Sequence, residues 1–251
     1  MAQFNLKVAG HTAYVTSLFE STRDYCRNYL TEEEPDFFIT VTPDDMAFEQ
    51  KMLDEEAAEE GMRRRRFTDP FLERAAIQRK FAEYLFDDDI LLFHGSAVAV
   101  DGEGYLFTAD CGTGKSTHTR LWRQAFGVRA QMVNDDKPFL QITQSGVLLH
   151  GAPWSGKHGL DTNMTVPLKG ICILHRGAEN RIDRITMAEA RQMLYKQACC
   201  PPEGEKREAF AGLVEQLGEK TALWQMDCNK EEQAAVMAHA AMRENNTTEE
   251  C

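Results

Sequence analysis

Residues 103–126, EGYLFTADCGTGKSTHTRLWRQAF, decide the fold of this chain. The apolar run that ends at Thr108 predicts a buried strand, and the residues after Lys115 predict a helix with Leu121 and Trp122 on its apolar face. Gly127 would stop that helix. A strand, a glycine-rich turn, a Lys-Ser pair and a helix, in this order, predict a P-loop.

The loop between this strand and helix has the composition of a phosphate-binding site. Its glycines let several backbone N–H groups converge on phosphate oxygens, and the helix N-terminus adds positive potential. Lys115 would reach the outer phosphates, and Ser116 would offer its hydroxyl to Mg²⁺. Ala109 replaces the first glycine of the usual pattern G-x-x-x-x-G-K-[ST]. We therefore expect ATP and Mg²⁺ as cofactors. The residues expected to hold the nucleotide are Asp110, Cys111, Gly112, Thr113, Gly114, Lys115, Ser116 and Thr117.

The sequence on either side of this stretch predicts further strands that would join the same sheet. Residues 90–108 form two apolar runs split by Asp101-Gly102-Glu103-Gly104, which predicts a hairpin. Residues 130–134 and 166–174 predict two further strands. Arg176 follows the second of these strands and can reach a phosphate, and pairing with Glu179 is the alternative.

Two adjacent carboxylates, Asp135 and Asp136, follow the strand predicted at 130–134. One can hold Mg²⁺ together with Ser116, and the other can take a proton from an attacking hydroxyl. Adjacent strand residues point to opposite faces, so we expect only one of them to face the nucleotide, unless a turn has already begun there. The sequence leaves open which of the two is the base. A solvated turn before Pro138 is the alternative.

A second glycine loop, residues 151–158, reads GAPWSGKH. It has His158 where a P-loop has Ser or Thr, and Pro153 removes a backbone donor. We interpret it as a loop that faces the phosphates or the acceptor, with Lys157 and His158 as candidate substrate contacts. The alternative is a structural turn with Trp154 packed in the core.

The order of Phe93-His94-Gly95 on a strand, ADCGTGKST and Asn134-Asp135-Asp136 resembles the catalytic domain of the HPr kinase/phosphorylase family, and of its relatives with a phosphoenolpyruvate-carboxykinase type of P-loop. The resemblance covers residues 90–177. It implies that Lys115 holds phosphates, that Ser116 and one Asp serve the metal, and that an Asp of the pair is the general base. It also implies that His94 lies near this carboxylate. Residues 151–163 do not match the signature segment of that family, so the acceptor stays open.

The amino-acid composition limits the classes of partner and the cell compartment that we expect for this protein. The net charge of −12 argues against nucleic acid or an anionic membrane as the main partner, because both select for basic surfaces. The first residues lack the pattern of a secretory signal, and no apolar run approaches the ~20 residues that span a bilayer. The seven cysteines are odd in number and form no C-x-x-C motif, so we expect reduced thiols and a cytoplasmic protein.

The 251 residues, 43% of them hydrophobic, suffice for a core domain with a smaller lobe. We divide the chain into an N-terminal α+β lobe at 1–87, a P-loop core at 88–200 and a C-terminal helical segment at 201–251 packed on the core. In the lobe, the patterns predict a hairpin at 4–15, a strand at 36–41, and helices at 17–30, from Pro43 and at 68–84.

Residues after 177 predict mainly helices. Thr186 and Glu189 form a capping box that opens a helix to about residue 198, and Pro201-Pro202 breaks the chain after it. Two more helical stretches flank residues 221–226, which can form a short strand, and the tail from Asn245 is polar.

These features together predict an α/β fold with a mixed sheet, a P-loop nucleotide-binding core and an N-terminal α+β lobe. The predicted activity is ATP-dependent transfer of a γ-phosphoryl group to a hydroxyl, serine-type by the resemblance, on a small protein, peptide or metabolite. The candidate catalytic residues are Lys115, Asp135, Asp136 and His94. The alternatives are an ATP sensor without turnover and a decarboxylating kinase. The sequence leaves the oligomeric state open, a homo-oligomer included.

Overall fold

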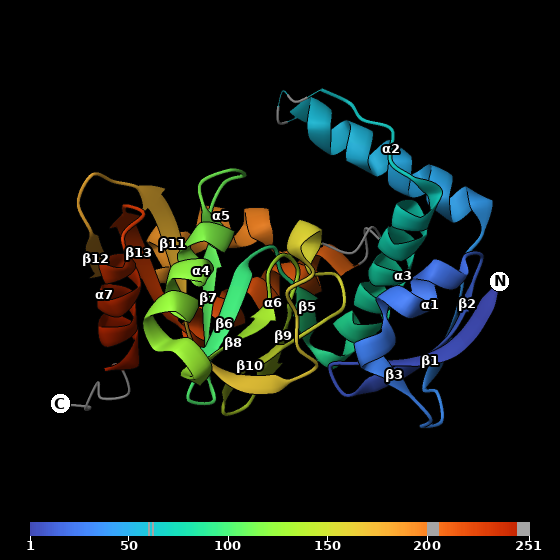
Figure 1. Ribbon diagram of the computed structural model, residues 1–251, viewed down its shortest axis with the longest axis horizontal. Helices are drawn as coiled ribbons and strands as arrows, with labels where there is room; N and C mark the ends of the chain where they lie inside the picture. The colour runs from blue at the N-terminus through green and yellow to red at the C-terminus, as the bar shows by residue number, and fades with distance from the viewer. Residues whose placement is uncertain (60, 62, 200–205, 245–251) are drawn as a thin grey trace. The chain divides into compact units, whose positions relative to one another are not determined.

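The chain forms two compact units, Met1–Asp87 and Asp88–Cys251, which we term unit 1 and unit 2. The computed structural model, shown in Figure 1, describes residues 1–59, 61, 63–199 and 206–244. The break expected at Pro201-Pro202 and the polar tail expected from Asn245 lie outside these residues. No helix in the described ranges is both long and apolar enough to cross a membrane.

Unit 1 is built on a four-stranded sheet with the strand order β3-β1-β2-β4. Its elements are β1 (Ala2–Val8), β2 (His11–Ser17), α1 (Glu20–Tyr25), the 3-10 turn η1 (Arg27–Tyr29), β3 (Leu30–Thr31), β4 (Phe37–Thr40), α2 (Pro43–Glu59) and α3 (Asp69–Leu85). The hairpin expected at 4–15 is confirmed, because β1 and β2 pair antiparallel around Ala9-Gly10. The strand expected at 36–41 and the helices from Pro43 and at 68–84 are confirmed as β4, α2 and α3.

The helix expected at 17–30 is wrong in its bounds, because α1 covers only Glu20–Tyr25. Ser17 still belongs to β2, and its hydroxyl donates to the carbonyl oxygen of Ala2 at 3.3 Å. At the other end, Cys26 leaves helical geometry and the chain continues as a 3-10 turn. Strand pairing and a tight turn therefore outweigh the apolar spacing at both ends.

Unit 2 is an α/β unit with a nine-stranded mixed sheet, as expected for the core. The strand order is β5-β9-β10-β11-β7-β6-β8, with β13 beside β11 and β12 beside β13. The strands are β5 (Ile90–Leu92), β6 (Ser96–Val100), β7 (Glu103–Thr108), β8 (Ala130–Asn134), β9 (Phe139–Thr143), β10 (Gly146–His150), β11 (Thr165–Arg176), β12 (Arg181–Arg184) and β13 (Ala222–Cys228). The helices are α4 (Lys115–Phe126), α5 (Met187–Gln197), α6 (Arg207–Lys220) and α7 (Glu232–Arg243), and short 3-10 turns cover Gly127–Arg129 and Gly156–His158. A further 3-10 turn, Phe86–Asp88, contains the point at which the chain passes from unit 1 to unit 2.

The expected hairpin is confirmed as β6 and β7, with a two-residue turn at Asp101-Gly102. Both turn residues have positive φ, 53° and 83°, which gives the turn the twist that a tight hairpin requires. The turn is shorter than the sequence predicts, since Glu103 and Gly104 already pair with Val100 and Ala99. It delivers β7 to the glycine-rich loop.

The longest strand of unit 2, β11, joins the two halves of its sheet. Its first residues pair with β10, residues 168–173 pair with β7, and residues 170–176 pair with β13. Because β7, β11 and β13 run parallel, their carboxyl ends meet at one edge of the sheet. The strand β13 was expected only as a short strand inside the helical segment at 201–251, yet it is a member of the main sheet.

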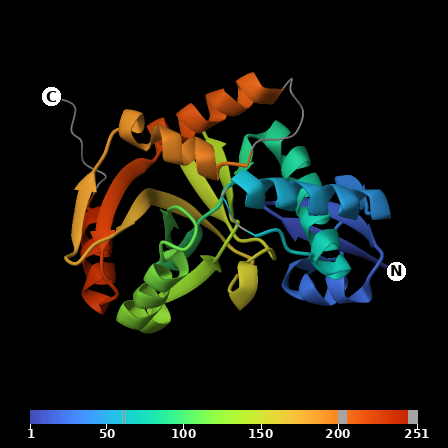
Figure 2. The ribbon, with the colours of Figure 1, turned by 90° about the horizontal axis from the view of Figure 1, so that it is seen from above.

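Helices cover both faces of this sheet. Figure 2 shows α4 and α7 on one face and α5 and α6 on the other. On the first face, α4 lies against β6, β7 and β8, and Leu121 and Trp122 are buried as expected. The capping box at the start of α5 is confirmed, with Thr186 and Glu189 each bonded to the other's backbone N–H.

In unit 1, a buried carboxylate joins α1 to α3. Glu73 of α3 is fully buried, and its two oxygens accept hydrogen bonds from the Leu18 N–H and the Thr22 hydroxyl. Removing this acceptor would leave both donors without a partner in the interior.

We expect Glu73→Ala to lower the free energy of unfolding by about 2–3 kcal/mol, measured by urea denaturation of the full chain. Glu56→Ala removes an exposed carboxylate of α2 and serves as the control, with an expected change below about 0.5 kcal/mol. Equal losses in the two variants would contradict the role given to Glu73.

Candidate functional site

The loop between β7 and α4, residues 109–114, begins in the core and ends at the first turn of a helix. Ala109 is fully buried among the apolar residues beneath α4, so its methyl group fills a place in the core. Gly112 and Gly114 have φ of 74° and 126°, a conformation that disfavours other residues. The helix starts directly after them at Lys115. The replacement of the first glycine by alanine is therefore explained by packing.

Three cationic side chains donate hydrogen bonds to this loop. Lys115 Nζ lies 3.0 Å from the carbonyl oxygen of Ala109, and Arg176 Nη2 lies 2.6 Å from that of Gly112. Lys196 Nζ of α5 lies 2.7 Å from the Asp110 carboxylate, and this hydrogen bond is the main reason that the pKa of Asp110 lies below its usual value. The loop thus lies in a strongly positive environment.

For Arg176, contact with a phosphate stays a prediction. Its guanidinium donates to the loop carbonyls of Gly112 and Thr113, and among the described residues no hydrogen bond or ion pair joins it to Glu179. The parallel pairing of β11 with β7 explains this, because it brings the end of β11 to the end of β7. Lys196 was missed by the sequence reasoning. It stands 86 positions from Asp110, and nothing local in an amphipathic helix marks such a partner.

Asp135 and Asp136 lie in the turn after β8 and not on the strand, so the expectation of opposite strand faces does not apply to them. Asp135 is buried, with 7% exposure, and its Oδ1 accepts a hydrogen bond of 2.6 Å from the Ser96 hydroxyl. Ser96 Oγ lies 2.8 Å from Thr119 Oγ1 on α4. This chain of side chains connects Asp135 to the helix that follows the glycine loop.

Asp136 is more open and has a different neighbour. Its Oδ1 lies 3.5 Å from His94 Nε2, and more than a third of its side chain is exposed. The expectation that His94 lies near a carboxylate of the pair agrees with this contact. The expectation that His94 sits on a strand is wrong, because it lies in the connection between β5 and β6.

The backbone around His94 explains why the strand ends there. The N–H groups of Phe93, His94 and Gly95 donate to the carbonyls of Pro138, Gln197 and Asp136, respectively, in place of a strand ladder.

Burial, together with the nearby charges of Lys115 and Lys137, lowers the pKa of His94 to about 3. A neutral imidazole is then present throughout the physiological range, so its contact with Asp136 is a polar contact and not an ion pair. The influence of Lys115 also shows that the start of α4 and the Asp136 turn belong to one site.

Asn134 fixes the turn that carries both carboxylates. Its buried amide oxygen accepts hydrogen bonds from the N–H groups of Asp136 (2.8 Å) and Lys137 (2.7 Å). Its amide nitrogen donates to the carbonyl oxygens of Ala152 (2.7 Å) and Trp154 (3.3 Å). One side chain therefore connects the carboxylate turn to the second glycine loop.

The second glycine loop is partly structural and partly exposed. Trp154 is buried in the core, as the structural alternative predicts. Gly156 then passes so close to Asp136 that a Cβ there would lie 3.2 Å from the Asp136 Cβ, which leaves little room for a side chain. Lys157 and His158 follow on an exposed 3-10 turn, and among the described residues no hydrogen bond or ion pair joins them to the rest of the site. The loop lines the Asp136 side of the site.

The next feature of the site is the set of side chains that could act as ligands of a metal ion. In the described ranges, no group of three or more His, Cys, Asp and Glu residues could hold a metal ion. The oxygens of Ser116 and Asp135 are of the kind that Mg²⁺ prefers. Among the described residues, the thiol of Cys111 in the loop takes part in no disulfide.

Comparison with known proteins finds distant likenesses among solved structures. No family model matches the chain, and no curated protein matches it. Among solved structures, the Hpr(Ser) kinase/phosphatase from Coxiella burnetii is similar to it with 12% sequence identity and a TM-score of 0.37, over 61% of this chain and 88% of that one. A likeness at this level assigns no activity to the chain.

The low pKa of His94 gives a first prediction. We expect its ring to stay neutral from pH 8 down to pH 5, since protonation of the folded state begins only near its pKa of about 3. The ¹⁵N chemical shifts of its ring in NMR spectra should therefore not titrate in that range. An imidazolium signal at pH 5 would contradict the site geometry.

The unfolded chain protonates this histidine near its ordinary pKa of 6.5, whereas the folded chain does not. His94 therefore lowers the free energy of unfolding as the pH falls below about 6.5. His94→Gln should reduce this loss, and an unchanged pH dependence of urea denaturation would contradict the assignment.

The position of Asn134 gives a second prediction. Asn134→Ala removes the partners of two carbonyls and two N–H groups, and we expect it to lower the free energy of unfolding by about 2–3 kcal/mol. Amide hydrogen exchange should accelerate at Asp136 and Lys137. Asn229→Ala removes two exposed hydrogen bonds, to Ala178 and from Glu231, and is the control, which should cost less than about 1 kcal/mol.

Proposed function

We propose that unit 2 binds ATP with Mg²⁺ at the β7–α4 loop and transfers the γ-phosphoryl group to the hydroxyl of an acceptor. The single observation that carries this proposal is the division between the two carboxylates. Asp135 is buried and connected through Ser96 to α4, whereas Asp136 is open beside a neutral histidine. A metal-holding and a proton-accepting carboxylate require these two different surroundings.

The phosphates would lie at the N-terminus of α4. There the loop N–H groups and the helix dipole favour oxyanions, and Lys115 and Arg176 supply positive charge. In this arrangement Lys115 would exchange its hydrogen bond with the Ala109 carbonyl for one with a phosphate oxygen. Arg176 would do the same from its place on Gly112.

Ser116 and Asp135 would hold the metal, whose chemistry is to neutralise charge on the transferred group. Asp135 suits this task because the Ser96 hydroxyl fixes the orientation of its carboxylate. Ser116 lies in the first turn of α4, and Thr119 follows it on the same helix. Buried carboxylates that are oriented in this way lose little freedom when a ligand binds.

Asp136 would accept the proton of the attacking hydroxyl. It is the exposed member of the pair, and a base must reach the acceptor. His94 stays neutral, so it does not neutralise the carboxylate charge, and its ring can hold Asp136 in position. Gly156 leaves free space beside the carboxylate, because any side chain there would press on it.

The acceptor is a hydroxyl on a small protein, a peptide or a metabolite, and Lys157 and His158 on their exposed turn are the candidates for contact with it. The alternative is an ATP sensor that binds without turnover. A sensor differs from a kinase in that it needs no proton acceptor. An experiment that tests the role of Asp136 in transfer can therefore distinguish the two.

The test combines ATP binding by calorimetry with transfer from γ-labelled ATP to a cell extract fractionated by size. Lys115→Ala should weaken ATP binding at least tenfold. Asp136→Asn should leave binding within about threefold of the native chain and reduce transfer by about 100-fold or more. Label in the macromolecular fraction indicates a protein or peptide acceptor, and label in the small fraction beyond free phosphate indicates a metabolite.

Glu219→Gln removes an exposed carboxylate of α6 and should change neither measurement. Undiminished transfer by Asp136→Asn would refute its role as base. Binding without transfer by the native chain would support the sensor.

A further inference from the structure

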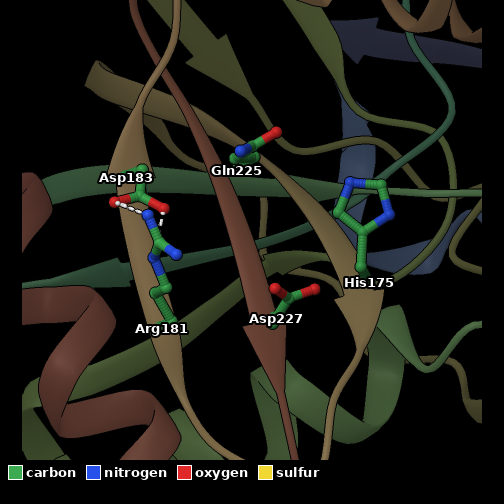
Figure 3. Close-up of a pocket in the computed structure, with 5 residues that line it drawn as sticks. All are labelled: His175, Arg181, Asp183, Gln225 and Asp227. Carbon is green, nitrogen blue, oxygen red and sulfur yellow. Dashed lines mark hydrogen bonds and ion pairs between the residues drawn. The ribbon is translucent and has the colours of Figure 1, made fainter.

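A polar cavity of about 280 Å³ opens on the face of the sheet of unit 2 that lies opposite α4. Figure 3 shows its lining, which comes from the neighbouring strands β11, β13 and β12. Its residues are His175, Arg181, Asp183, Gln225 and Asp227. The register explains the grouping, because Asp227 pairs with both His175 and Arg181, and Gln225 pairs with Asp183. The intervening Leu174 and Met226 are buried in the core on the other face.

The charges in this cavity favour a ligand whose groups donate hydrogen bonds. Arg181 and Asp183 form an ion pair of 2.8 Å and neutralise each other. The Asp227 carboxylate, the Gln225 amide and the His175 ring all face the cavity, and in the part of the chain that the structure describes no hydrogen bond or ion pair engages them. Because Arg181 is already paired with Asp183, the Asp227 carboxylate gives the cavity a negative charge. The cavity therefore disfavours phosphate and favours hydroxyl and amino groups.

The cavity lies close to the β7–α4 loop. Thr108, the last residue of β7, pairs with Ile173, so His175 lies two residues beyond the level at which the loop begins. The strand β13 is two strand spacings from β7, about 10 Å. Arg176, next to His175, donates to the loop carbonyl of Gly112, and His175 contributes to the lowered pKa of Asp110. A ligand at the loop can therefore extend into the cavity.

The positions of the carboxylates set the direction in which such a ligand lies. Asp136 follows β8, and the strand order from β8 through β6 to β7 places it on one side of the loop. The cavity lies on the other side, on β11 and β13. If phosphoryl transfer takes place at Asp136, the γ-phosphate points toward β8 and the remainder of the nucleotide points toward β11 and β13.

We propose that this cavity holds the ribose of the nucleotide, whose hydroxyl groups donate hydrogen bonds to the Asp227 carboxylate and to the Gln225 amide oxygen. The inference rests on the proposed function, since it takes the direction of the triphosphate from Asp136. The size is compatible with a sugar ring, because 280 Å³ lies just below the range of about 300–1,000 Å³ that holds drug-sized ligands. A ring with two adjacent hydroxyls fits such a space, whereas a macromolecular acceptor does not.

The experiment measures dissociation constants by calorimetry for three probes in the presence of Mg²⁺: ATP, 2′,3′-dideoxy-ATP and inorganic tripolyphosphate. The native chain should bind ATP at least tenfold more tightly than dideoxy-ATP, because the latter leaves Asp227 without its donors. In Asp227→Ala, ATP should bind about as weakly as dideoxy-ATP. Tripolyphosphate, which has no ribose, should bind this variant and the native chain equally.

Gln225→Ala is a second variant on the same strand and should reduce the preference for ATP by a smaller factor. Glu219→Gln, outside the cavity, should retain the full preference. Equal binding of ATP and dideoxy-ATP by the native chain would overturn the ribose assignment while tripolyphosphate binding still supports the loop as a phosphate site. Failure of all three probes to bind would overturn the proposed function and this inference together.

Discussion

The candidate site depends on one buried amide. A primary amide offers two donors and an oxygen with two lone pairs, and Asn134 uses all four in hydrogen bonds to backbone groups. Two of these bonds close the turn that presents Asp135 and Asp136, and two hold the chain at Ala152 and Trp154. The carboxylates and the loop beside them are therefore positioned by hydrogen bonds from the interior of the protein.

The surroundings of the two carboxylates follow from this placement. Because the turn begins directly after β8, Asp135 points into the space between β6 and α4, where Ser96 meets it, and Asp136 points to the open side near His94. Identical side chains at adjacent positions thus acquire different exposure and different partners. The positive groups gathered at the β7–α4 loop complete the contrast, since they donate hydrogen bonds to oxygens of that loop.

Local sequence rules predicted much of the fold and part of the site. The hairpin around Asp101-Gly102, the helix after Gly114 and the capping box at Thr186 each depend on a few neighbouring residues, and all three form, although the hairpin turn is shorter than expected. The contact of His94 with Asp136 was anticipated through the family resemblance, but the end of the strand before it was not, because its backbone donors find partners on three distant segments. Lys196, Ser96 and the cavity on β11 and β13 arise from strand order and helix placement, which no short motif encodes.

The alternation of side chains along β11 has a consequence for the tolerance of this strand to change. Arg176 reaches the glycine loop from one face of the sheet, while its neighbour His175 lines the polar cavity on the opposite face. A shift of the register of β11 by one residue, such as an insertion early in the strand would produce, would send each of these side chains to the wrong face. Both contacts would then be lost in a single event. The end of β11 is therefore far less free to vary in length than a surface loop, although both of its last residues are exposed.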